Sequence, residues 1–268
     1  MNKLSLITLI LLVAVFATSA SGRSLVLTDV VGYNWHRGCA PTAAGMLFGY
    51  HDGRGYEYLF PGSADTLTDA VKKRIASNEH YNDYSLPIDS QGAIQSDKSE
   101  TDPTGCHEDN SIADFMLTSR SSENIWYGGT WVKDIDDGME AYATWCGYDS
   151  NAWNESWGQF IFDDLVNEIE NNRPMVLHVD SDADGDVDHA VCAIGYNDET
   201  NQYACYNTND TSIHWYDFTA VANGQSYGVD GATFFVMITE PIPEPSTIAM
   251  IIGALGIGIP FVRRAGRR

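Results

Sequence analysis

Basic residues are scarce in this chain: 15 lysines and arginines stand against 37 aspartates and glutamates, a formal net charge of −22 over 268 residues. A protein that binds nucleic acid needs a basic face to contact phosphate groups, so this deficit excludes nucleic acid as a partner. The sequence also has no internal repeat. Its 44% hydrophobic and 12% aromatic residues are enough for one packed core, which excludes the disordered and fibrous classes.

Long apolar runs are confined to the two ends of the chain. At the start, Lys3 is followed by the apolar residues 4–16 and by the small residues 17–20. A basic start, an apolar stretch and a small-residue exit are typical of a secretory signal peptide, which we expect to be removed near Ala20. The run is too short to span a bilayer comfortably, which disfavours a transmembrane anchor.

At the other end, Pro243, Glu244 and Pro245 precede the apolar residues 248–262 and an arginine-rich terminus that ends at Arg268. As a helix, the apolar segment would be about 22 Å long, shorter than the roughly 30 Å hydrocarbon core of a bilayer. The order of these parts resembles the PEP-CTERM sorting signal of Gram-negative bacteria. The resemblance implies export through the inner membrane on a short transmembrane helix, processing by an exosortase near Pro243, and delivery to the cell surface or extracellular matrix. A plain tail anchor is the alternative.

The two ends leave residues 21–242 as a single domain, with 1–20 as signal peptide and 243–268 as sorting signal. Helices are expected first and an antiparallel sheet after them, which is the order of an α+β fold. The expected helices cover 40–51, 66–77, 111–118, 135–145 and 159–170, and the expected strands 175–179, 189–195, 203–208, 213–218 and 233–239. Trp131 is expected on a brief strand, and residues 78–110, rich in Ser, Asp, Gly and Pro, form a predicted surface excursion.

A cysteine stands directly before the first expected helix. Cys39 follows Gly38, and Pro41 lies in the first helical turn. Free N–H groups and the positive end of the helix dipole stabilise a thiolate, so the acidity of the Cys39 thiol is expected to rise there. A buried structural cysteine is the alternative reading.

A candidate base lies downstream at the start of a strand. His189 opens the expected strand 189–195, and the returning strand 203–208 carries Asn207. If these strands are neighbours, Asn207 can accept the second N–H of the His189 ring and hold the ring toward the thiolate. A nucleophile, a base and an orienting amide in this chain order meet the needs of acyl transfer.

These motifs resemble those of a known family. Residues 34–47 look like the active-site helix of papain-like cysteine peptidases, in particular the bacteriocin-processing (double-glycine) branch. Residues 189–196 resemble that branch's histidine strand, and 203–208 the strand of its third catalytic residue. The resemblance covers residues 33–218. It implies a papain-like α+β fold in which the nucleophile helix packs on an antiparallel sheet.

The resemblance also implies roles for individual residues. Cys39 becomes the nucleophile, His189 the general base and Asn207 the orienting residue, with Asn209 and Asp210 as nearby alternatives for the last role.

One position departs from the family pattern. The family's oxyanion-hole side chain is a glutamine shortly before the nucleophile, and Asn34 stands at that place here. It has the same N–H donor on a shorter stem, and the backbone N–H of Cys39 would be the second donor. A turn asparagine is the alternative for Asn34.

Carboxylates alternate through the loop before the histidine, with Gly185 at the sixth position: Asp180, Asp182, Asp184, Asp186 and Asp188. Ca²⁺ takes six to eight oxygen ligands, and this spacing resembles the first half of an EF-hand or dockerin-type loop. Val191 stands where a bidentate Glu would complete the pattern, so Asp188 and main-chain carbonyls would have to substitute. We expect either structural Ca²⁺ or a solvated acidic turn. The carboxylates are also expected to raise the pKa of His189, and bound Ca²⁺ to offset that effect.

The five cysteines divide into three groups. Cys192 and Cys205 lie on strands whose alternation points them apart, so no bridge is expected between them. Cys106 and Cys146 are the expected disulfide of an exported protein, and Cys39 is left as the odd thiol.

The sequence thus predicts an exported cysteine peptidase that hydrolyses peptides or proteins through a Cys39 thioester and requires no cofactor for catalysis. Two alternatives stay open: an amidase acting on cell-wall peptide, and a catalytically idle, calcium-stabilised surface protein that binds without reacting. The role of the 78–157 region is not indicated by its sequence.

Overall fold

A seven-stranded antiparallel sheet is the centre of the fold in the computed structural model, which describes residues 22–84, 110–120 and 124–238. The strands follow the spatial order β2-β7-β3-β4-β5-β6, and β1 pairs with the end of β4. They are β1 Ser24–Val26, β2 Ser150–Ser156, β3 Met175–Asp180, β4 His189–Asn197, β5 Gln202–Tyr206, β6 Ile213–Asp217 and β7 Gly228–Met237.

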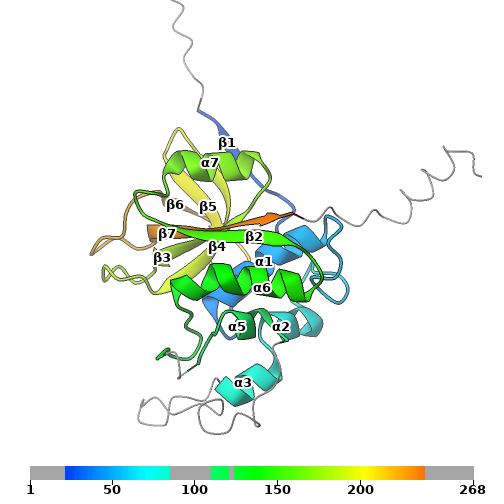
Figure 1. The fold of residues 1–268 in the computed structure, drawn as a ribbon. Helices are drawn as coiled ribbons and strands as arrows, with labels where there is room; N and C mark the ends of the chain where they lie inside the picture. Colours follow the sequence, from blue (N-terminus) through cyan, green and yellow to red (C-terminus); the bar gives the residue numbers. More distant parts are fainter. Residues whose placement is uncertain (1–21, 85–109, 121–123, 239–268) are drawn as a thin grey trace, which may run out of the picture.

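Helices cover both faces of this sheet (Figure 1). Helix α7 packs on β4 and β1 from one side, whereas α1 packs on β4 and β3 and α6 packs on β2 and β7 from the other. Because both faces are covered, β3 is buried along its whole length. The helices are α1 Cys39–Asp52, α2 Asp69–Ile75, α3 Asn78–Tyr84, α5 Ile112–Phe115, α6 Ile135–Trp145 and α7 Phe162–Glu170, with a 3-10 helix η3 at Val132–Asp134.

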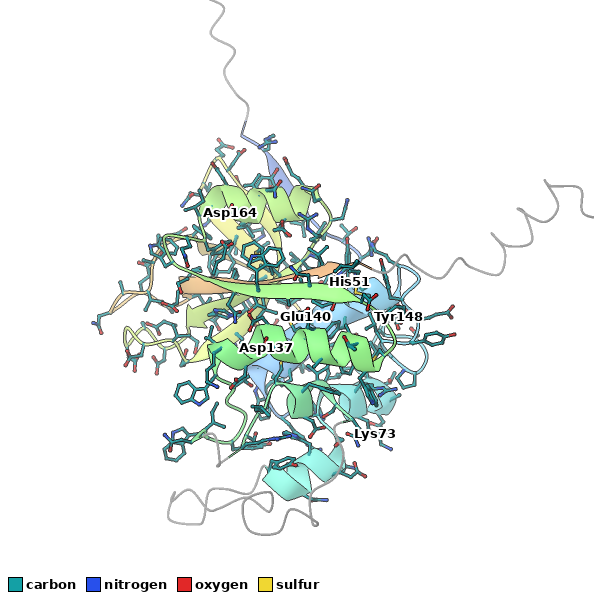
Figure 2. The ribbon with its side chains drawn as sticks, viewed as in Figure 1. His51, Lys73, Asp137, Glu140, Tyr148 and Asp164 are labelled. Carbon is teal, nitrogen blue, oxygen red and sulfur yellow. The ribbon has the colours of Figure 1, made fainter. Side chains whose placement is uncertain are left out.

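Helix α1 lies in the middle of the core. Nearly all of its residues are buried, including the small residues Ala43 and Ala44 that let it approach the sheet closely. Near its C-terminal end, the ring of His51 packs on Tyr56 and on Phe235 of β7 (Figure 2). Burial lowers the pKa of His51 to about 4, so this ring is neutral at physiological pH and acts as a packing group. A fully buried helix cannot shift easily, which fixes the position of its first residue.

The α+β class is confirmed, and all the described helices precede the strands β3 to β7, although β1 and β2 come earlier in the chain. The predicted hairpin is present as well, since β4 ends at Asn197 and β5 begins at Gln202. Two local predictions are wrong, and two strands were missed. Residues 78–84 form helix α3 within the predicted excursion, Trp131 leads into η3 rather than lying on a strand, and the strands β1 and β2 were not predicted.

Strand β2 was missed for a physical reason. Its sequence contains Ser, Asn and Glu, which are depleted in strands. It forms through pairing with β7 along its full length, and Trp153 stacks on Phe234 with ring centroids 4.9 Å apart. Tertiary contacts therefore override local preference here.

The expected signal peptide 1–20, the sorting signal 243–268 and Cys106 lie outside the described residues. Within the described ranges, no helix combines the length and the apolar character needed to cross a bilayer.

Candidate active site

The nucleophile candidate is the first residue of α1. Gly38 precedes it as the helix N-cap, and a Cβ at Gly38 would come within 2.7 Å of the Pro41 ring, so glycine is needed for the chain to enter the helix. The hydroxyl of Thr42 donates to the Gly38 carbonyl at 2.6 Å and accepts from the His36 N–H at 3.0 Å. These contacts hold the turn that carries the Cys39 sulfur.

The structure brings Cys39 and His189 together. His189 is the first residue of β4; its side chain and that of Cys39 line the same cleft, where the imidazole acts on the thiol. Burial of the sulfur raises the pKa of Cys39, but the hydrogen bond and charge of His189 and the N–H groups of Ala190 and Ala40 outweigh it. The net result is a lowered pKa for the Cys39 thiol. The sulfur is therefore favoured as a thiolate.

The same contact acts on the imidazole. Burial lowers the pKa of His189, whereas the hydrogen bond and charge of Cys39, the Asn207 carbonyl and the Asp188 carboxylate raise it, and the net direction is upward. A lowered thiol pKa beside a raised imidazole pKa describes a thiolate–imidazolium pair. Of the acidic loop, Asp188 is the carboxylate that contributes to the raised pKa of His189.

The orienting contact differs from the prediction. The main-chain carbonyl of Asn207 lies 2.8 Å from His189 Nε2, and the Asn207 carboxamide points elsewhere. That carboxamide donates to the Tyr216 hydroxyl at 3.2 Å and accepts from the Asn209 N–H at 3.0 Å. The expected contact between carboxamide and imidazole is thus replaced by a main-chain contact. The alternative residue Asp210 pairs instead with His214.

The structure gives no support to the oxyanion prediction for Asn34. Asn34 is exposed and is not among the residues that line the cleft beside Cys39. Its place in the loop is set by the next residue, because the Trp35 N–H bonds to the Thr208 carbonyl at 2.6 Å.

A cleft of about 900 Å³ opens beside the Cys39–His189 pair. The start of α1, the segment 124–135 and the residues before β4 form its walls. A Cβ on Gly128 would lie 2.9 Å from the Trp35 ring, and the φ of Gly128 is +81°, so only glycine fits there. Several partly exposed aromatic rings line the cleft: Trp35, Trp126, Tyr127 and Trp131. Apolar surface therefore adjoins the nucleophile.

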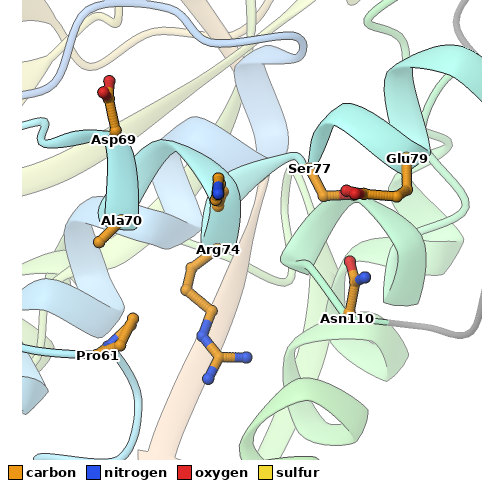
Figure 3. A pocket seen from close by; sticks show the side chains of 8 residues that line it. Pro61, Asp69, Ala70, Arg74, Ser77, Glu79 and Asn110 are labelled. Atoms are coloured by element: carbon orange, nitrogen blue, oxygen red, sulfur yellow. The ribbon is translucent and has the colours of Figure 1, made fainter.

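A second cavity, of about 470 Å³, lies beside α2 and the start of α3 (Figure 3). Its lining is polar, with Arg74, Glu79 and Asn110 around it. It contains neither a cysteine nor a histidine, so it offers no cysteine–histidine pair for acyl transfer.

Three of the five loop carboxylates gather in one place. One oxygen each of Asp180, Asp182 and Asp184 lies within 4.8 Å of the others. Both oxygens of buried Asp180 already accept main-chain N–H groups, from Ala183 and Gly185, at 2.7 Å. Asp188 is turned away and accepts from Ser181, and Asp186 is outside the group.

The described cysteines other than Cys39 do not take part in the site. Burial raises the pKa of Cys146 to about 11 and also raises the pKa of Cys192 and of Cys205. Cys192 and Cys205 are free and buried, as expected. Cys146 is a free thiol here rather than half of the expected disulfide, and Cys106 lies outside the described residues.

Sequence reasoning found Cys39 and His189 but missed the Asn207 carbonyl and the cleft wall at 124–135. A main-chain carbonyl has no residue signature. The wall did have a signal, since Trp126, Tyr127 and Trp131 surround a pair of glycines.

The model of the Peptidase C39-like family matches residues 27–233. Among solved structures, the interpain A cysteine protease of Prevotella intermedia is 13% identical with a TM-score of 0.43, over 77% of this chain and 93% of that one. No curated protein matches the chain.

Proposed function

This chain belongs to the Peptidase C39-like family of cysteine-type peptidases, and we propose that it hydrolyses peptide bonds through a Cys39 thioester. The observation that carries the proposal is the placement of Cys39, at the start of α1, and His189, at the start of β4, in one cleft where the imidazole lowers the pKa of the thiol. The thiolate attacks the carbonyl carbon of the scissile bond, and a tetrahedral oxyanion forms.

The first turn of α1 supplies one donor for that oxyanion. First-turn N–H groups have no partner within a helix, so they are available to a ligand. Pro41 has no N–H, and the Ala40 N–H is directed to the sulfur. The Cys39 N–H is the first-turn donor that is left for the substrate oxygen.

His189 carries the proton in both halves of the reaction. As imidazolium it donates a proton to the leaving amine when the tetrahedral intermediate collapses, which breaks the peptide C–N bond and leaves the thioester. The neutral ring then takes a proton from water, which attacks the thioester carbonyl and releases the acid product. The thiolate and the imidazolium are both regenerated.

The cleft supports an extended peptide as substrate. Its aromatic walls offer apolar contact to side chains of a bound segment. A folded protein would have to present a loop or terminus to enter.

The proposal is tested by incubating the purified protein with a mixture of synthetic peptides and identifying products by mass spectrometry. Cleavage that disappears after stoichiometric alkylation of Cys39 supports a peptidase. A fully alkylatable protein that cleaves no peptide, but releases ammonia or an amine from cell-wall peptide, would favour the amidase instead.

Replacing Asn34 by alanine is expected to change kcat/KM by less than about threefold, because this exposed side chain lies outside the cleft. Loss of a true oxyanion donor would lower kcat by about 10²-fold or more. Steady-state kinetics on one cleaved peptide separates the two cases. A hundredfold drop in kcat at unchanged KM would identify Asn34 as an oxyanion donor.

We also propose that the loop of Asp180, Asp182 and Asp184 binds Ca²⁺ as a structural ion. The support is their mutual proximity, together with the raised pKa of Asp182, for which desolvation is the largest cause and the charge of Asp184 contributes. At a Ca²⁺ concentration about 100 times Kd, the melting temperature should rise by about 5–10 °C relative to chelator. The double variant Asp182→Asn, Asp184→Asn should lose this difference. Equal melting temperatures of the wild type with Ca²⁺ and with chelator would exclude the site.

Export belongs to the proposal as well. The support is the pattern of the two ends, with residues 1–20 as signal peptide and 243–268 as a sorting signal for exosortase processing. Mass spectrometry of the protein from its native host would locate both cleavage points.

A further inference from the structure

The turn after β5 contains a strained residue in contact with the histidine. Thr208 has a φ of +65°, a left-handed conformation that is a genuine outlier for a β-branched residue. Its side chain is fully buried, and its Oγ1 lies 3.2 Å from His189 Nε2. Such strain persists only where the surrounding structure enforces it, and it is concentrated at functional sites.

Two oxygens meet the same ring nitrogen. The Asn207 carbonyl can only accept a hydrogen bond, so Nε2 must carry a proton, and Thr208 Oγ1 shares that proton as a second acceptor. With Nε2 protonated, Nδ1 is the nitrogen left for the Cys39 thiol. The pair of oxygens therefore selects the tautomer that makes the ring a base toward Cys39.

Thr208 also reaches the other half of the site. Its carbonyl accepts the Trp35 N–H at 2.6 Å, which ties it to the loop that enters α1 four residues before the nucleophile. One residue thus contacts the histidine through its side chain and the nucleophile loop through its main chain.

The surroundings hold this turn in place. The Asn207 carboxamide spans Thr208 by accepting the Asn209 N–H, and it donates to Tyr216. Tyr216 stacks on Tyr227 with centroids 3.9 Å apart, and Tyr227 meets the His189 ring edge-on at 6.3 Å. The carboxamide therefore supports the turn rather than the imidazole.

We propose that Thr208 is the positioning residue of the histidine, and that its hydroxyl, with the Asn207 carbonyl, takes the place of an orienting carboxamide. This inference rests on the proposed function for its catalytic meaning. The groups that face the ring are Cys39 from α1, Asp188 before β4 and Tyr227 before β7. All three are left unchanged in the variants below, so a difference between variants reports the altered turn residue alone.

The experiment measures the rate of Cys39 alkylation by iodoacetamide against pH, followed by mass spectrometry of the Cys39 peptide. In this step the thiolate forms a C–S bond and iodide leaves. Thr208→Val removes the hydroxyl and keeps the branched shape, whereas Thr208→Ser keeps the hydroxyl. Asn207→Ser keeps the carbonyl and an oxygen that can accept the Asn209 N–H.

Both acceptors stabilise the imidazolium, so losing one destabilises the thiolate–imidazolium pair. The pH window is the pH range over which Cys39 reacts as the thiolate of the thiolate–imidazolium pair. In Thr208→Val this window should narrow by about half a pH unit at each end. The value of kcat/KM on a cleaved peptide should fall about three- to tenfold. Thr208→Ser and Asn207→Ser should keep the wild-type window. If Thr208→Val fails to fold by circular dichroism, Thr208→Ala compared with Thr208→Ser makes the same test.

An unchanged window in the variants that lack the hydroxyl, or a window narrowed by Asn207→Ser alone, overturns the inference. Because alkylation needs no peptide substrate, its result stands apart from the proposed function. A wild type that shows the pH window but cleaves no peptide refutes the peptidase proposal. The role of Thr208 is still tested in that case, by the alkylation rates of the variants.

Discussion

Replacing Cys39 by alanine is expected to lower kcat for peptide hydrolysis by at least about 10⁴-fold. No other described cysteine reaches the His189 ring, and without the sulfur no thioester can form. The melting temperature should change by no more than a few degrees, because the side chain is small and half-buried at the end of a helix that stays packed. Steady-state kinetics and a thermal melt on the same preparation measure both effects.

The matched control is Cys146→Ser. This residue is also half-buried but lines a different cavity, beside Arg74 and Trp145, and burial raises the pKa of its thiol to about 11. The control should keep full activity. Hydrolysis that survives in Cys39→Ala would mean that another group is the nucleophile.

The second large effect is expected for His189→Ala, measured as the reactivity of Cys39. In the wild type the pKa of Cys39 is lowered and that of His189 is raised, so the reactive pair is present between the two values and is lost below the first and above the second. Without the imidazole, burial dominates and the pKa of the Cys39 thiol rises. The alkylation rate near pH 6 should then fall by about 100-fold and recover as the pH is raised above about 8.5.

His214→Ala serves as the control for this experiment. His214, on β6, pairs with Asp210 and does not line the cleft, so its removal should leave the pH profile unchanged. An alkylation profile that is the same in His189→Ala and in the wild type would favour the idle binding protein over the enzyme.

The strongest sequence signals were those that combine local chemistry with periodicity. Cys39 could be placed at a helix start because glycine precedes it and proline lies in the first turn. The strands β3 and β4 could be read from their apolar runs, since buried strands leave few polar residues. The meeting of Cys39 and His189 then followed from chain order and family resemblance.

What the sequence could not show depends on main-chain geometry and on long-range pairing. The Asn207 carbonyl acts through a group that every residue has, so its identity carries no information about the contact. The left-handed turn at Thr208 runs against the preference of that residue and is enforced by its neighbours. Strand β2 exists because β7 pairs with it, which no window of its own polar sequence reveals.

The unequal acidities of the thiols have a practical consequence. Among the four cysteines that the structure describes, burial raises the pKa of three, whereas Cys39 alone is made more acidic. A limiting amount of thiol reagent at mildly acidic pH should therefore be consumed by Cys39 before the other three react. The molar amount consumed would count the competent molecules in a preparation, and rates could be expressed per functional centre rather than per total protein.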